Sequence, residues 1–203
     1  MKSPDNHPRG GQMSVYGAQG ARKYLTSSER KRFLRATRRI RLVDRLFCLV
    51  VAWSGGRISE VLALTASSFD LDAGTVALVT LKRRRSGLVR QIVLPPFLVK
   101  SLMRNLNLKS AQRDPERAAE RLWPWSRVTG WRCIKRVMAL ADIRGLGATA
   151  KGLRHTFGVH AFQANVPPHL VQRWLGHASL RTTAIYADVL GQEERRFASR
   201  MWR

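Results

Sequence analysis

Two short runs rich in β-branched and aliphatic residues interrupt a chain whose apolar pattern is otherwise helical. They span residues 75–81 and 88–94, and the very basic segment Lys82–Gly87 lies between them. Two such runs around a short polar segment are typical of an antiparallel β-hairpin. A turn at Asp70–Gly74 precedes the first run and leaves room for one further short strand. We therefore expect an α+β fold that is mainly α, with a small antiparallel β-sheet near residues 69–94.

Helical patterns stand on both sides of this hairpin. Thr26 and Glu29 have the spacing of a capping box, which predicts a helix that runs to about Arg39. A second, more buried helix is broken by Ser54–Gly56, so Arg57 stands at the start of the next helix. Unpaired backbone amides and the helix dipole favour an anion at such a position.

The charge of the chain predicts a polyanionic partner. Its 203 residues hold 37 Lys and Arg against 13 Asp and Glu, a formal net charge of +24. An excess of this size favours nucleic acid. A membrane surface is the weaker alternative, because the basic residues run through the whole chain rather than along one amphipathic helix. A hydrophobic content of 44% is ample for the core of one domain.

Targeting and metal signals are missing from the sequence. The longest apolar run, Leu46–Trp53, is too short to span a bilayer, and the N-terminus has no apolar signal region. Cys48 and Cys133 form no CxxC pair and are interpreted as free thiols in a reducing compartment. We expect a cytoplasmic protein with no metal site and no membrane partner.

The chain divides into an arm and one domain. Residues 1–24 are rich in Gly and Pro and predict a flexible basic N-terminal arm, whose alternatives are plain disorder and contact with DNA. Residues 25–203 form the domain. Its tail, residues 189–203, carries apolar side chains that predict docking, either on the same chain or on a neighbouring subunit.

Two basic surfaces are candidates for DNA contact. One is the tip of the hairpin; the alternative is that its charges protect a sheet edge. The other is the polar face of a helix beginning at Ser126, for which a solvated face is equally plausible. The residues concerned are Arg83, Arg84 and Arg85 at the tip and Arg132, Lys135 and Arg136 on the helix.

The last third of the chain adds side chains suited to phosphoryl transfer. Arg57 and Arg154 could grip the non-bridging oxygens of a phosphodiester, since a planar guanidinium binds two such oxygens at once. Tyr186 is the natural nucleophile, because the two other tyrosines lie in or next to the arm. His177 could bind the phosphate or accept the phenol's proton. His155 is interpreted as a packing and hydrogen-bonding residue, and Glu60 as orienting Arg57 or capping its helix.

These segments, in this order, resemble the catalytic domain of the tyrosine recombinase (phage integrase) family. The family pattern is an arginine in a G-R-x-S-E context, a lysine in a β-hairpin, H-x-x-R, L-G-H and a later tyrosine. The resemblance covers residues from about Leu25 to Ala187. The matching positions are Arg57, Lys82, Lys151, Arg154, His177 and Tyr186.

The resemblance implies an enzyme that breaks and rejoins double-stranded DNA. Tyr186 would form a 3′-phosphotyrosine link that a 5′-hydroxyl reverses, so neither ATP nor a metal nor another cofactor is needed. Lys82 would be the general acid for the leaving 5′-oxygen. The outcome could be integration, inversion or resolution. The alternatives are a non-catalytic DNA-binding module with the same fold and a DNA-relaxing enzyme similar to type IB topoisomerases.

The sequence departs from the family pattern in two informative places. Lys151 stands where H-x-x-R has histidine; it can donate to a phosphate oxygen but is a poor base near neutral pH. By this resemblance we also expect a protein without the separate N-terminal domain of many relatives, similar to the small single-domain members such as the fimbrial phase-variation invertases. We therefore expect self-association as a dimer or tetramer on DNA, and allow for an accessory protein.

Overall fold

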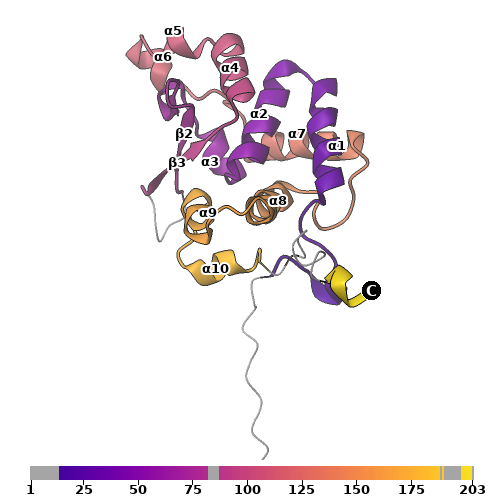
Figure 1. Ribbon diagram of the computed structural model, residues 1–203. Helices are drawn as coiled ribbons and strands as arrows, with labels where there is room; N and C mark the ends of the chain where they lie inside the picture. The colour runs from indigo at the N-terminus through magenta and orange to yellow at the C-terminus, as the bar shows by residue number, and fades with distance from the viewer. Residues whose placement is uncertain (1–13, 82–86, 188, 190–197, 203) are drawn as a thin grey trace, which may run out of the picture.

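The computed structural model describes residues 14–81, 87–187, 189 and 198–202 (Figure 1). It confirms a mainly helical domain with one small antiparallel sheet. The helices in chain order are α1 (Ser27–Ala36), α2 (Leu42–Ser54), α3 (Ile58–Leu62), α4 (Pro96–Asn105), α5 (Leu108–Ala111), α6 (Pro115–Ala119), α7 (Arg127–Leu140), α8 (Ala150–Gln163), α9 (Pro168–Leu175) and α10 (Leu180–Ala184), with short 3₁₀ turns such as η5 (Ser199–Trp202) near the end.

The sheet is an antiparallel meander in the order β1 (Phe69–Asp70), β2 (Thr75–Val79) and β3 (Val89–Val93). Side chains alternate across it, as strand geometry requires. Leu78 and Ile92 face the core, whereas Val79 and Val89, paired across the ladder, are exposed. The β2–β3 hairpin is therefore where the sequence predicted it.

Helix α2 is the centre of the core. Apolar side chains cover most of its circumference, so it is enclosed by α3, α4, α7 and α8 rather than lying on the surface. It ends at Gly55, whose φ of 61° is the left-handed conformation that glycine adopts readily at a helix C-terminus. The chain then turns directly into α3. This break lies against α8 and α9, since a Cβ added at Gly55 would lie 2.6 Å from Phe157 and 3.1 Å from Leu175.

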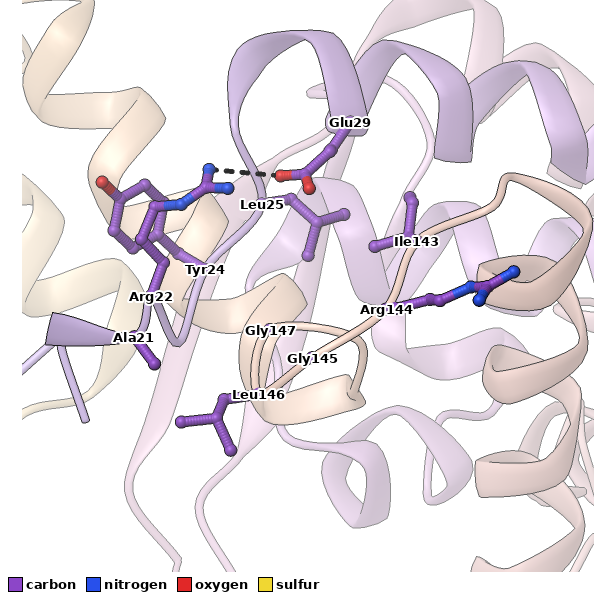
Figure 2. A pocket seen from close by; sticks show the side chains of 10 residues that line it. All are labelled: Ala21, Arg22, Tyr24, Leu25, Glu29, Ile143, Arg144, Gly145, Leu146 and Gly147. Carbon is purple, nitrogen blue, oxygen red and sulfur yellow. Dashed lines mark hydrogen bonds and ion pairs between the residues drawn. The ribbon is translucent and has the colours of Figure 1, made fainter. Parts of the chain in front are cut away.

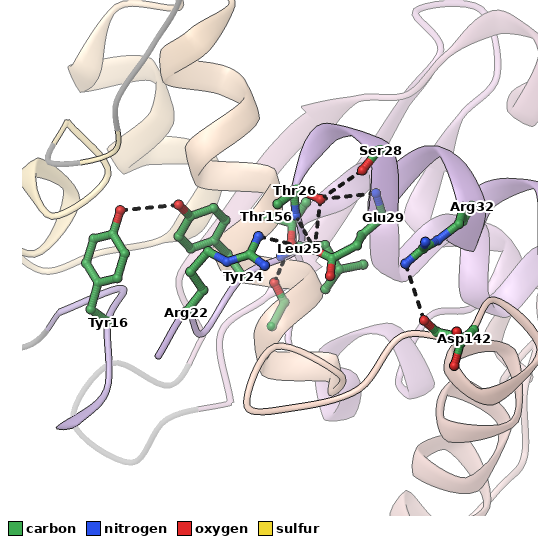
Figure 3. Close-up of polar contacts among 11 residues, drawn as sticks. Tyr16, Arg22, Tyr24, Leu25, Thr26, Ser28, Glu29, Arg32, Asp142 and Thr156 are labelled. Carbon is green, nitrogen blue, oxygen red and sulfur yellow. Dashed lines mark hydrogen bonds and ion pairs between the residues drawn. The ribbon is translucent and has the colours of Figure 1, made fainter. Parts of the chain in front are cut away.

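The start of the domain lies earlier than the sequence indicated. The predicted capping box is present: Thr26 Oγ1 accepts from the backbone N–H of Glu29, whose carboxylate accepts from the backbone of Thr26. However, Val15 and Tyr24 are buried, and the two tyrosine hydroxyls of the segment, Tyr16 and Tyr24, lie 3.3 Å apart (Figure 3). Residues 14–24 are thus packed on the domain and are not part of a flexible arm.

That first segment lies against the loop that leads into α8. Figure 2 shows Arg22, Tyr24 and Leu25 opposite Ile143–Gly147, with a small pocket between them. The backbone N–H of Leu25 donates to Thr156 Oγ1 of α8 across 2.8 Å, which fixes the segment to the helix that carries Arg154. No helix in the part of the chain described above is long and apolar enough to cross a membrane.

Candidate active site

Helix α8 supplies a buried arginine that connects two helix ends. Arg154 Nη1 donates to the carbonyl of Gly55 across 2.8 Å, and Nη2 donates to the carbonyl of Leu175. These carbonyls terminate α2 and α9, where the helix dipoles concentrate partial negative charge. Burial and then the charge of Arg57 lower the pKa of Arg154 to about 10, so it is still a cation at neutral pH.

Arg57 is the N-cap residue of α3 and is held from one side by Glu60. Its Nη1 and its backbone N–H both donate to Glu60, each across 2.7 Å, which confirms the orienting role expected of that glutamate. The Arg57 side chain is 37% exposed, whereas Glu60 is 1% exposed. The rest of the guanidinium can therefore reach a phosphate from solvent while the carboxylate stays inside.

A second, unexpected arginine completes the environment of Glu60. Arg90 is buried on β3, and its Nη2 donates to Glu60 Oε2. Burial alone would raise the pKa of Glu60, but the hydrogen bond and charge of Arg90, followed by those of Arg57, hold that pKa below its usual range. An ionised carboxylate therefore sits between two guanidinium groups.

Tyr186 follows α10 and points inward. It is buried, and its ring lies on Gly158 of α8, where an added Cβ would approach ring carbons to 2.6 Å. The ring of His177 stacks on it at 6.1 Å between centroids and 18° between planes. Burial raises the pKa of the phenol, while the charges of Arg154 and Arg57 lower it. The hydroxyl is therefore within electrostatic range of both arginines.

His155 contacts the same hydroxyl, which agrees with the hydrogen-bonding role expected of it, although its partner was not predicted. Its Nδ1 is 3.3 Å from Tyr186 Oη, and its buried Nε2 has no hydrogen-bond partner among the described residues. Burial, then the charges of Lys151 and Arg154, lower the pKa of His155 to about 4, so the imidazole is neutral at pH 7. A neutral imidazole can accept a phenol proton. No local pattern indicates this contact, because the two residues are 31 positions apart.

His177 follows the left-handed C-cap Gly176 of α9, as predicted. Its Nδ1 is 2.9 Å from Thr183 Oγ1 of α10, which sets the plane of the ring. Burial, followed by the charges of Arg154 and Arg57, lowers the pKa of His177 to about 3. The imidazole is therefore neutral in the free protein.

The remaining predicted residues do not all meet at this site. Lys82 and the tip residues Arg83, Arg84 and Arg85 lie outside the described residues. Lys151 is exposed at the start of α8. On α7, Arg132 and Arg136 are exposed, whereas Lys135 donates to the carbonyl of Ala148 across 3.1 Å and so also serves the loop before α8.

Comparison with known proteins shows similarity over most of the chain. The model of the phage integrase family matches residues 23–193. Tyrosine recombinase XerA of Thermococcus kodakarensis is 31% identical over 173 residues, which cover 82% of this chain and 58% of that protein. Tyrosine recombinase XerD of Haemophilus influenzae is 26% identical over 184 residues, which cover 88% of this chain and 62% of that protein.

Solved structures show the same fold. A crystal structure of XerA recombinase superposes with a TM-score of 0.71 at 24% identity, covering 88% of this chain and 64% of that one. The structure of XerH site-specific recombinase in a post-cleavage complex with palindromic difH substrate superposes with a TM-score of 0.74 at 23% identity. The match covers 94% of this chain and 57% of that one. The chain thus spans about three fifths of the length of these relatives.

Proposed function

Because this chain belongs to the phage integrase family, we propose that it is a site-specific recombinase that cleaves and rejoins double-stranded DNA through Tyr186. One observation carries the proposal. Four segments far apart in the sequence bring the Tyr186 hydroxyl within electrostatic range of Arg57 and Arg154, with His155 and His177 against the same side chain. Phosphoryl transfer without a metal needs a nucleophile, cations where charge develops and groups that can move a proton.

In the first step the Tyr186 Oη attacks phosphorus and the bond from phosphorus to the 5′-oxygen breaks. The DNA strand is then joined to the protein through a 3′-phosphotyrosine. The phenol proton leaves to a neighbouring base, for which the Nδ1 of neutral His155 lies at 3.3 Å. A 5′-hydroxyl attacks the same phosphorus in the second step and releases the phenol, so the number of phosphodiester bonds is unchanged.

The arginines carry the charge of this reaction. Arg57 offers the part of its guanidinium that Glu60 does not occupy, and Arg154 is fixed by two backbone carbonyls. Cations held rigidly where charge develops cost no reorganisation during the reaction. Lys82 supplies the proton to the departing 5′-oxygen, and Lys151 donates to a phosphate oxygen.

The partner is double-stranded DNA, bound by a self-associating assembly of the chain in the cytoplasm. The family match, the net charge of +24 and the exposed Arg132 and Arg136 on α7 support the DNA contact. Arg83, Arg84 and Arg85 extend this surface at the hairpin tip, and Lys135 belongs to it through its position on α7. An accessory protein supplies grip on the DNA if the chain alone binds weakly.

One observation favours a second candidate, a DNA-binding module without catalysis. Tyr186 is 2% exposed, so the phenol cannot reach a phosphate of duplex DNA without a change in the segment around it. A chain in which this burial persists on DNA would bind without cutting.

Covalent trapping separates these candidates. Purified protein is mixed with supercoiled DNA from the replicon that encodes it, quenched with detergent and assayed for a protein–DNA adduct. We expect an adduct that disappears in Tyr186→Phe and persists in the matched control Tyr16→Phe. Tight binding with no adduct refutes the enzyme and supports the binding module. Adducts mapped to many unrelated sequences would instead indicate a relaxing enzyme.

A further inference from the structure

A buried arginine outside the family pattern connects the segments that carry the candidate site. The Arg90 side chain is 2% exposed and uses every nitrogen of its guanidinium. Nε donates to the carbonyl of Trp174 across 2.8 Å, Nη1 to Thr80 Oγ1 across 2.9 Å, and Nη2 to Glu60. Its three partners belong to three different parts of the fold.

Each partner stands next to a residue of the proposed mechanism. Glu60 is the carboxylate that holds Arg57. Trp174 is near the end of α9, whose C-cap leads directly to His177. Thr80 follows β2, two positions before Lys82. A single buried side chain thus connects Glu60, Trp174 and Thr80, and through the first two it connects the segments that carry Arg57 and His177.

The end of α9 is shaped around this arginine. Gly176 has a φ of 63°, and a Cβ added there would lie 3.2 Å from Cδ and 3.3 Å from Nε of Arg90. The close approach leaves little freedom for either group. The position of His177, one residue later, is therefore coupled to the position of Arg90.

We propose that Arg90 is a positioning residue that sets Arg57 and His177 relative to each other for attack on the scissile phosphate. The inference rests on the proposed function of the site. Only an arginine has donors in a fixed fork that can meet a carboxylate, a hydroxyl and a carbonyl together. A lysine would keep the charge beside Glu60 but could not hold all three partners in the same geometry.

The competing explanation is a buried ion pair with a purely structural role. Removing one partner of such a pair is strongly destabilising whether or not catalysis depends on it. A test must therefore use a readout that stability alone does not move. The charge of the scissile linkage supplies one, because the guanidinium groups act on the non-bridging oxygens.

The experiment compares Arg90→Lys with wild type on a duplex containing the site mapped by covalent trapping. Two linkages are used at the scissile position: a phosphodiester and an uncharged methylphosphonate. With the phosphodiester at saturating protein, we expect the adduct rate to fall by roughly 100-fold, as for a catalytic group displaced by about 1 Å. With the methylphosphonate the ratio of the wild-type rate to the Arg90→Lys rate should be at least about tenfold smaller, because attack on a neutral linkage depends less on aligned cations.

DNA affinity of Arg90→Lys should stay within about threefold of wild type in our estimate, because Arg90 is buried and contacts no DNA. The matched control is Arg144→Lys, which alters an exposed pair with Asp142 and should leave both rates unchanged. Thr80→Val, which removes one of the three partners, should give a smaller deficit with the same dependence on linkage. An Arg90→Lys rate equal to wild type, or equal deficits on both linkages, would overturn the positioning role.

A measurement without DNA keeps this test separate from that of the proposed function. In wild type the depressed pKa of Glu60 contributes stability that is present above its unfolded pKa and is lost as pH falls through the lower folded pKa. In Arg90→Met that contribution should shrink, because only Arg57 then opposes the effect of burial on the Glu60 pKa, so stability should depend less on pH than in wild type. If wild type forms no adduct, the enzyme proposal fails whatever this result. If Arg90→Met keeps the wild-type pH dependence, Arg90 does not hold Glu60 and the positioning role fails by itself.

Discussion

The packing of Tyr186 on Gly158 gives a sharp test of the resting site. In Gly158→Ala the new methyl would lie 2.6 Å from Cε2 and Cζ of the Tyr186 ring, so the ring must move. Overpacking of this kind costs roughly 1–3 kcal/mol. Alanine inside a helix is favoured over glycine by about 1 kcal/mol. We expect a net change between about zero and 2 kcal/mol of destabilisation.

A double-mutant cycle isolates the contribution of the ring. In a Tyr186→Ala background nothing opposes the methyl, so Gly158→Ala should stabilise by about 1 kcal/mol, and the coupling between the sites should be roughly 1–3 kcal/mol. Thermal unfolding resolves this, because 1 kcal/mol shifts Tm by about 2–4 °C for a domain of this size. The matched control is Gly130→Ala on α7, whose added Cβ would lie 3.0 Å from Phe47 Cζ. Its effect on stability should be the same in the wild-type and Tyr186→Ala backgrounds. Equal effects of Gly158→Ala in both backgrounds would refute packing of Tyr186 on α8.

Three further outcomes are expected. The folded pKa values of His155 and His177 lie near 4 and 3, below the unfolded value of about 6.5, so stability should be full above pH 6.5 and decline as pH falls toward 4. Replacing either histidine with Asn should lower the slope of unfolding free energy against pH, measured by urea unfolding, by the equivalent of about one proton. The Sγ atoms of Cys48 on α2 and Cys133 on α7 lie 3.5 Å apart, so diamide, which takes up their two hydrogens, should form an intramolecular disulfide; mass spectrometry would detect it, and Cys133→Ser should prevent it. The affinity for DNA should fall steeply with salt, and Arg136→Gln should reduce the slope of log affinity against log salt by about 1; an unchanged slope would remove that residue from the interface.

Features written in local sequence were predictable. The capping box at Thr26, the break at Gly55 and the alternation of the hairpin each depend on a few neighbouring residues, and all are present. The pair of Arg57 and Glu60 also belongs to this class, because residues three apart face each other on a helix. The order of the segments was enough to group the site residues, but not to show their contacts.

Contacts between distant segments were not predictable. His155 meets Tyr186 only because α8 and the turn after α10 pack together, and Cys48 meets Cys133 only because α2 and α7 do. The buried position of Arg90 could, however, be predicted from the alternation of the strand. It stands two residues before Ile92, in the phase of the strand that faces the core, and an arginine in that phase needs partners that the sequence does not name.

The charge of the site follows from what is buried with it. Glu60 is paired with Arg57 and Arg90, Arg154 is a further buried cation, and desolvation keeps both histidines neutral, so the free site carries an excess of positive charge. Part of the depression of the His177 pKa comes from Arg154 and Arg57. A phosphate between these arginines offsets their charge and therefore raises the pKa of His177 toward its ordinary value. Binding of the substrate thus makes protonation of the His177 imidazole easier at the moment when charge develops on the phosphate oxygens.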